Sequence, residues 1–321
     1  MQDVYFFEAF AEEAELLRSL LPPNIRAEFT DKTIQETGMT EAPAPLISIR
    51  TQSAIPVAWA KWVSGILARA TGHDHLAAYR KAAGVAVPGG YLPLYCARAV
   101  AEQAMLLWMG LLRKLPQQTR HFRTFERDGL TGRECEGRHL LVVGVGNIGS
   151  QVVRVGKALG MTVKGVDIVR RESDVEYVSI DEGLPWAEVL VCAMNLTETN
   201  RGYFRYNVLR NARHGLIFVN VSRGEFVVAS DLVRLLDEKR LGGVGLDVYS
   251  DEPRLAVQLR RGQAPTDLEA KAVLSLSERP SAILTPHNAF NTREAVQRKA
   301  EQSIEQVRVF LETGAFKWPV P

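Results

Sequence analysis

The chain has 321 residues, of which 46% are hydrophobic and 24% are charged, and its formal net charge is +2. This composition is typical of a soluble globular protein, and at roughly 150 residues per domain the length favours two domains. Because the charges are balanced and no long single-sign run occurs, we expect no nucleic-acid partner. No apolar stretch approaches the ~18 residues that a membrane span needs, so we expect no membrane association either.

The cysteines and the first residues bear on the compartment. Cys96, Cys135 and Cys192 are odd in number and far apart, which predicts free thiols in a reducing environment. Residues 1–7 lack the basic head and the small-residue cleavage site of a signal peptide. A cytoplasmic protein is therefore expected. We expect no metal: His73 and His75 flank Asp74, but no partner ligand cluster stands elsewhere, and we interpret the segment as a surface loop.

The N-terminal part of the chain alternates strand-like and helix-like stretches. Strands are expected at residues 4–7, 46–49 and 65–68, and a helix is expected at 12–21, stopped by Pro22 and Pro23. This order predicts a small α/β unit with a parallel sheet.

A long apolar helix is predicted next, at residues 97–115, closed by Pro116. Val100, Ala104, Leu107, Leu111 and Leu115 follow helical spacing and form one face. Met105, Leu106, Trp108 and Leu112 widen that face beyond what one core needs. A helix that is apolar on all sides is buried on several sides, so we expect it both between domains and in the interface of a homodimer.

From His139 onward the chain alternates regularly between short β-branched runs and helical connections. The expected strands are residues 140–145, 162–166, 189–192, 216–221, 244–248 and 282–284, followed by a final helix at 291–311. This rhythm is typical of a doubly wound parallel sheet.

A glycine-rich loop stands directly behind the first of these strands. Gly144, Gly146 and Gly149 form a G-x-G-x-x-G motif, with Asn147 and Ile148 between the last two glycines. In a strand–turn–helix context, such glycines permit a tight turn, let the backbone approach a pyrophosphate, and let helix and strand pack closely. The helix N-terminus supplies N–H donors to the phosphates. We therefore predict a dinucleotide site.

An acidic residue supports the same site. Asp167 ends the second strand of this region, near the spacing at which a carboxylate receives the adenosine ribose hydroxyls. A carboxylate there would repel a 2′-phosphate, which favours NAD over NADP. The nearby Arg170 and Arg171 leave NADP open as the less favoured cofactor.

Three further segments end predicted strands, where ligands bind in such sheets. The first carries Arg223, whose planar guanidinium suits a clamp on a carboxylate and its adjacent carbonyl oxygen. The third carries His287, which can donate a proton near neutral pH. Glu252, in the second, would hold the orientation of that histidine. Together with a hydride donor, these parts suffice to reduce a 2-keto acid.

These motifs, in this order, resemble those of the D-isomer-specific 2-hydroxyacid dehydrogenase family, which includes D-lactate, glyoxylate/hydroxypyruvate and D-3-phosphoglycerate dehydrogenases. The resemblance implies an oxidoreductase that transfers a hydride between NAD(H) and a small D-2-hydroxy or 2-keto acid. It also implies that Arg223 binds and polarises the substrate, and that His287 and Glu252 form the acid/base pair.

The same resemblance assigns further residues. Asp247 would lie near the nicotinamide carboxamide, and Val100 at the start of the long helix would border the cofactor. Asn195 and Val221, near the ends of two expected strands, complete the expected cofactor contacts. Thr71 and Gly72 resemble the loop whose backbone N–H groups hold the substrate carboxylate.

The resemblance also implies the domain plan. The fold class is α/β, with two Rossmann-like doubly wound parallel-sheet domains. A substrate-binding domain of residues 1–98 and 290–321 would be interrupted by an NAD-binding domain of residues 99–289. Closure of the two domains would exclude water.

The sequence motifs are compatible with two alternative functions. A regulatory, corepressor-like NAD sensor and a phosphite-dehydrogenase-like enzyme share the fold and are alternative functions. The connection at residues 254–282 is longer than expected, and we interpret it as surface decoration. Arg69, beside Thr71, is interpreted as a solvated side chain.

Overall fold

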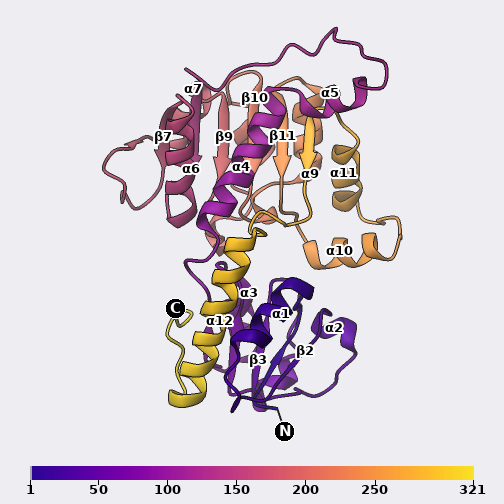
Figure 1. Cartoon of the computed structure of the whole chain (residues 1–321). Coiled ribbons are helices and arrows are strands. Elements are labelled where there is room, and N and C mark those ends of the chain that lie inside the picture. The colour runs from indigo at the N-terminus through magenta and orange to yellow at the C-terminus, as the bar shows by residue number, and fades with distance from the viewer. Residues whose placement is uncertain (1) are drawn as a thin grey trace. The chain divides into compact units, whose positions relative to one another are not determined.

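The computed structural model describes residues 2–321 and divides into two compact units. One unit comprises residues 1–96 and 291–321, and the other comprises residues 97–290. Each is an α/β layer structure built on its own parallel sheet (Figure 1). The predicted fold class is confirmed, with one unit inserted into a discontinuous second unit.

The discontinuous unit has a five-stranded sheet in the order β2-β1-β3-β4-β5, in which all pairs are parallel. Its strands are Val4–Phe6 (β1), Ala27–Phe29 (β2), Leu46–Ile49 (β3), Gly65–Ala68 (β4) and Gly89–Gly90 (β5). Its helices are Ala11–Leu20 (α1), Ile34–Thr37 (α2), Asp74–Ala83 (α3) and Arg293–Thr313 (α12), with a 3-10 turn at Val57–Lys61 (η1).

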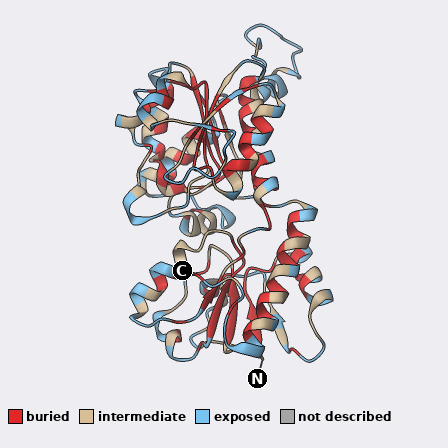
Figure 2. Ribbon diagram, turned by 90° about the vertical axis from the view of Figure 1, so that its left-hand side faces the viewer, coloured by how far each residue is buried: buried red, intermediate tan, exposed pale blue. Residues whose placement is uncertain are grey.

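Both faces of this sheet are covered. Tyr5, Ile47 and Ile66, which pair side by side on β1, β3 and β4, belong to one apolar core. Residues of α2, α3 and η1 complete this core. On the other side, α12 packs against α1 and β4. The fit there is close, since a Cβ on Gly65 would lie 2.3 Å from the ring of Phe310. Figure 2 shows the strands of each unit as its most continuously buried part.

The inserted unit has a seven-stranded parallel sheet in the order β12-β11-β10-β9-β6-β7-β8. This is the doubly wound order with its reversal between β6 and β9. The strands are His139–Val143 (β6), Thr162–Val166 (β7), Glu176–Tyr177 (β8), Val189–Cys192 (β9), Leu216–Asn220 (β10), Leu241–Leu246 (β11) and Ala282–Leu284 (β12).

Helices cover both faces of this sheet as well. They are Ala97–Leu112 (α4), Leu115–His121 (α5), Asn147–Ala158 (α6), Ile180–Trp186 (α7), Tyr206–Leu209 (α8), Ala229–Asp237 (α9), Glu252–Arg260 (α10) and Leu268–Ser277 (α11), with 3-10 turns at Glu198–Asn200 (η2) and Gly224–Phe226 (η3). The long helix α4 packs on α6 and on β10 and β11, whereas α9 and α11 pack together on the other side. No described helix is both long and apolar enough to cross a membrane.

One correction concerns the long helix. It ends at Leu112 rather than at Leu115, and Pro116 lies in the first turn of the separate helix α5. A proline ring clashes with the carbonyl four residues earlier, here that of Leu112, but it is tolerated in a first turn. The chain therefore breaks before the proline, with Lys114 in the left-handed region at φ 52°.

Three other expectations are wrong in detail. The segment around His73 and His75 is not a surface loop, because α3 begins at Asp74 and the histidines are half-buried. The 254–282 connection is not only surface decoration, because Leu255 of α10 and Ala270, Val273 and Leu276 of α11 belong to the buried core of the unit. Arg69 is fully buried rather than solvated, because it is bound to Glu13, Ser48 and the carbonyl of Phe7. The three cysteines are free thiols, as predicted.

Candidate active site

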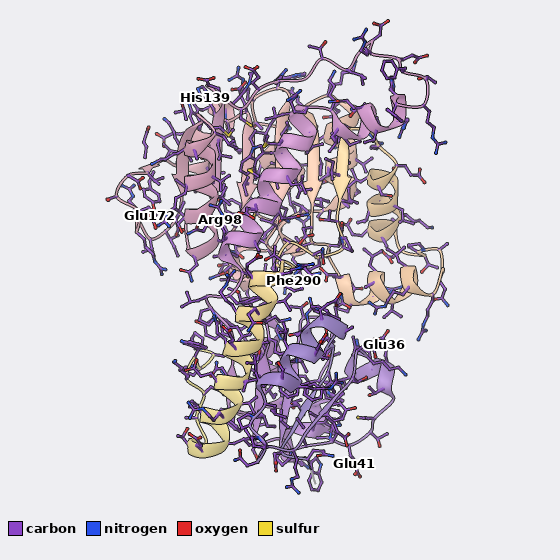
Figure 3. The ribbon with its side chains drawn as sticks, in the orientation of Figure 1. Glu36, Glu41, Arg98, His139, Glu172 and Phe290 are labelled. Atoms are coloured by element: carbon purple, nitrogen blue, oxygen red, sulfur yellow. The ribbon has the colours of Figure 1, made fainter. Side chains whose placement is uncertain are left out.

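The strand register aligns all the predicted motifs of the inserted unit. Val166, Val143, Cys192, Asn220, Leu246 and Leu284 pair in one row across six adjacent strands. Asp167, Gly144, Val221, Asp247 and Thr285 each follow directly on that row. In an open parallel sheet, ligands bind at the carboxyl ends of the strands. Figure 3 shows the opposite ends of this unit, with His139 at the start of β6 and Phe290 beyond β12.

The three glycines of the loop are needed for different reasons. Gly144 has φ +92°, and a Cβ there would lie 2.6 Å from the backbone nitrogen of Met194. A Cβ on Gly149 would lie 1.9 Å from the carbonyl oxygen of Gly144, so the first turn of α6 and the end of β6 require its absence. A Cβ on Gly146 would meet no protein atom within 4 Å. Packing inside the protein therefore does not require glycine at position 146.

This open position fits a dinucleotide. Gly146 is the N-cap of α6, where backbone N–H groups and the helix dipole favour an anion. Asn147 is exposed and Ile148 is half-buried in the first turn. These residues could hold the pyrophosphate of NAD, with the space beside Gly146 available for its approach.

Asp167 is tied to the same loop. One carboxylate oxygen accepts a hydrogen bond from the backbone nitrogen of Val145 at 2.6 Å, and the other accepts one from Val169 at 2.9 Å. The carboxylate is thus fixed at the end of β7, beside the glycine loop. The other expected cofactor residues are distributed over the same unit: Val100 is buried in α4, Asn195 is exposed behind β9, and Val221 is buried behind β10.

The loop that carries Arg223 is held by a buried asparagine. The Asn220 side chain donates to the carbonyl of Arg223 at 2.8 Å and accepts from the backbone nitrogen of Ser222 at 3.1 Å. The Arg223 guanidinium donates to the carbonyl of Ser222 at 2.9 Å. Sequence reasoning missed Asn220, although a polar residue at the end of an apolar strand was a usable signal.

The loops behind β10 and β11 touch at their backbones. A Cβ on Gly224 would lie 1.8 Å from the carbonyl carbon of Tyr249. Only glycine fits there, and this contact fixes the Arg223 loop against the segment that leads to Glu252.

His287 and Glu252 lie within hydrogen-bond distance. The imidazole Nδ1 is 2.7 Å and 2.9 Å from the two carboxylate oxygens of Glu252. Both side chains are mostly buried, with 22% and 14% of their surfaces exposed. Glu252 opens α10, so it is not part of a simple turn. His287 and Asp251 are both non-glycine residues in the left-handed region, at φ 50° and 49°.

Asp247 binds the turn that carries His287. Its carboxylate accepts hydrogen bonds from the Thr285 hydroxyl at 2.5 Å and from the backbone nitrogens of Asn288 and Ala289, both at 2.8 Å. Burial raises the pKa of this fully buried carboxyl above its ordinary value, against the opposing effect of these hydrogen bonds.

Thr71 and Gly72, the expected substrate residues, belong to the discontinuous unit. The Thr71 hydroxyl donates to the carbonyl of Leu92 at 3.0 Å and lies 3.4 Å from the Cys96 thiol. Among the described residues, no group of three or more His, Cys, Asp or Glu side chains could hold a metal ion.

The fold and the glycine loop define a nucleotide-binding protein of the Rossmann class. The family model "D-isomer specific 2-hydroxyacid dehydrogenase, NAD binding domain" matches residues 105–289. The chain therefore belongs to the D-isomer specific 2-hydroxyacid dehydrogenase family. This confirms both the predicted enzyme class and the predicted cofactor, NAD.

Relatives and solved structures agree with the family. The chain is 30% identical over 231 residues to hydroxypyruvate reductase of Thermotoga maritima, covering 71% of this chain and 69% of that protein. It is 29% identical over 230 residues to D-lactate dehydrogenase of Streptococcus agalactiae, covering 70% and 69%. The structure of Aquifex aeolicus D-lactate dehydrogenase complexed with NAD and lactic acid has the same fold. It matches at a TM-score of 0.84 and 24% identity over 98% of this chain and 99% of that chain.

Proposed function

We propose that the protein transfers a hydride between NAD(H) and a small D-2-hydroxy acid or its 2-keto acid. The observation that carries the proposal is the His287–Glu252 pair, which lies behind adjacent parallel strands in the unit that also holds the glycine loop. The hydride acceptor and donor is NAD, and the chain's own residues supply binding, orientation and proton transfer.

His287 is the proposed acid and base. Its Nδ1 faces Glu252, so Nε2 is the ring nitrogen that gives its proton to the carbonyl oxygen during reduction and takes it back during oxidation. Glu252 keeps the ring in one orientation, and its place at the start of α10 fixes the carboxylate in turn.

Arg223 is the proposed substrate clamp. A guanidinium has five N–H donors in a rigid plane, which suits the carboxylate and the neighbouring carbonyl of a 2-keto acid. The bonds from Asn220 and the close contact at Gly224 hold the backbone of this arginine. Preorganisation of this kind lowers the cost of orienting the substrate.

The remaining assignments are extensions of the same proposal. Gly144, Gly146, Gly149 and the first turn of α6 would bind the pyrophosphate, and Asp167 would bind the adenosine ribose. Residues 1–98 and 290–321 would form the substrate domain, with Thr71 and Gly72 as substrate-carboxylate ligands, and residues 99–289 would form the NAD domain. The assignment of Thr71 and Gly72 to the substrate is supported by the family resemblance.

The test is NADH and NADPH oxidation against a panel of 2-keto acids. The panel contains pyruvate, glyoxylate, hydroxypyruvate, phenylpyruvate, 2-ketoisocaproate and oxaloacetate. We expect turnover with at least one acid, and a loss of about 10²–10⁴-fold in His287→Ala with NADH binding unchanged. Wild-type turnover in that variant would refute the assignment. Silence of the wild-type protein across the panel, with NADH still bound, would instead favour the sensor or the phosphite-oxidising alternative.

A further inference from the structure

The turn that presents His287 is not held by its own conformation. His287 has φ 50°, a left-handed value that is uncommon for residues with a Cβ, although histidine adopts it more often than most. Its backbone nitrogen donates to the nearby carbonyl of Thr285 at 3.0 Å. Conformations of this kind persist when surrounding contacts over-determine them. Contacts from outside the turn must therefore fix the imidazole.

Tyr249 supplies one such contact at the start of the turn. Its hydroxyl donates to the carbonyl of Thr285 at 2.8 Å, and it lies 3.3 Å from the carbonyl of Leu246. The Thr285 carbonyl is the same oxygen that accepts the bond from the His287 backbone. Burial raises the pKa of Tyr249 well above its ordinary value, so the hydroxyl stays protonated and remains a donor.

The other side of Tyr249 touches the arginine loop. Its carbonyl carbon lies 1.8 Å from the place that a Cβ on Gly224 would take, so its backbone packs directly on the residue after Arg223. Tyr249 therefore bridges the Arg223 loop, through its backbone, and the His287 turn, through its hydroxyl. Asp247 makes different bonds, to the Thr285 hydroxyl and to the later backbone nitrogens of Asn288 and Ala289.

We infer that Tyr249 is a positioning residue for catalysis, which sets His287 relative to Arg223 through its hydrogen bond to the Thr285 carbonyl. This inference rests on the proposed function of His287. It gives Tyr249 no contact with substrate or cofactor. The residue acts only by fixing the turn, so its effect must disappear when His287 is absent.

The experiment is a double-mutant cycle with Tyr249→Phe and His287→Ala on the full chain. Tyr249→Phe keeps the ring and removes one oxygen atom. We expect kcat for keto-acid reduction to fall on the order of tenfold to a hundredfold, because small misplacements of catalytic groups have large effects. The Kd for NADH and the thermal unfolding midpoint should change little. In the His287→Ala background, Tyr249→Phe should cause no further loss.

The split between kcat and KM separates positioning from a general structural effect. We expect kcat for reduction to fall in Tyr249→Phe while the KM for the keto acid changes little, because the Tyr249 hydroxyl fixes the turn that carries His287. The matched control is Tyr206→Phe, which removes a hydroxyl bonded to Glu238 at 2.8 Å in another part of the same unit. It should leave both kcat and KM in place.

Two results would overturn the inference. One is an equal loss from Tyr249→Phe with and without His287, and the other is an unchanged kcat in a variant that still binds NADH. Failure of the proposed function would look different, because His287→Ala alone would then retain wild-type turnover.

Discussion

Gly146 and Gly149, the last two glycines of the cofactor loop, should respond in different ways when alanine adds a methyl group. In Gly149→Ala the new Cβ would lie 1.9 Å from a backbone oxygen, about 1.5 Å inside an ordinary contact. Backbone cannot rotate away as a side chain can, so the cost falls at the upper end of overpacking, at about 3 kcal/mol. For a domain of this size that is a fall of about 6–12 °C in Tm.

Gly146→Ala should leave the fold intact and damage cofactor binding. Its Cβ would meet no protein atom within 4 Å, and its extended backbone, with φ −86°, is accessible to alanine. Loss of one charge-assisted hydrogen bond to a displaced pyrophosphate costs about 1.5–3 kcal/mol. The Kd for NADH should therefore rise by about ten- to a hundredfold.

Thermal unfolding and NADH titration on both variants would measure this contrast. We expect Gly149→Ala to have a reduced Tm. We expect Gly146→Ala to have a normal Tm but weaker NADH binding. Parental NADH affinity in Gly146→Ala would show that the open space does not receive the pyrophosphate. A parental Tm in Gly149→Ala would refute the packing argument.

Other predictions concern charge and assembly. Glu13 is buried, which alone would raise its pKa, but Arg69 and Lys299 lower it to about 2. The contribution of Glu13 to the free energy of unfolding should therefore be lost as pH falls from about 4.5 towards 2. In urea titrations, the free energy of unfolding of Glu13→Gln should depend less on pH over this range. Burial also lowers the pKa of Lys299 from 10.5 to about 7, so stability should rise with pH between those values, and less so in Lys299→Met. Asp167→Ser should raise kcat/KM for NADPH relative to NADH, and an unchanged ratio would contradict the proposed role of that carboxylate. The homodimer stays a prediction: Leu106 on α4 is 54% exposed, and sedimentation should show a dimer that Leu106→Glu dissociates.

Much of this protein could be predicted from local sequence patterns. The strands at Leu46–Ile49, Gly65–Ala68, Thr162–Val166, Val189–Cys192 and Ala282–Leu284 have the predicted bounds. Buried parallel strands are continuous apolar runs, which are easy to recognise. The glycine loop, the acid behind the next strand and the three strand-end motifs were visible for a related reason. Each depends on residue types at short, fixed spacings.

Short polar or glycine-rich strands escaped the same reasoning. Glu176–Tyr177 and Gly89–Gly90 carry no apolar run, and only pairing with a neighbouring strand defines them as strands. Pro116 was assigned the wrong role because a proline can end one helix or begin another.

The tertiary structure alone decided what each polar residue contacts. Arg69 looked solvated beside Thr71, but its guanidinium is buried on Glu13, 56 positions earlier in the chain. The bond from Tyr249 to Thr285 spans 36 positions, and the pair of Glu252 and His287 spans 35. Local sequence determines which residues follow a strand, because each strand is recognised from the apolar pattern of its own residues. Which strand ends lie side by side depends on the sheet order, and that is a property of the whole chain.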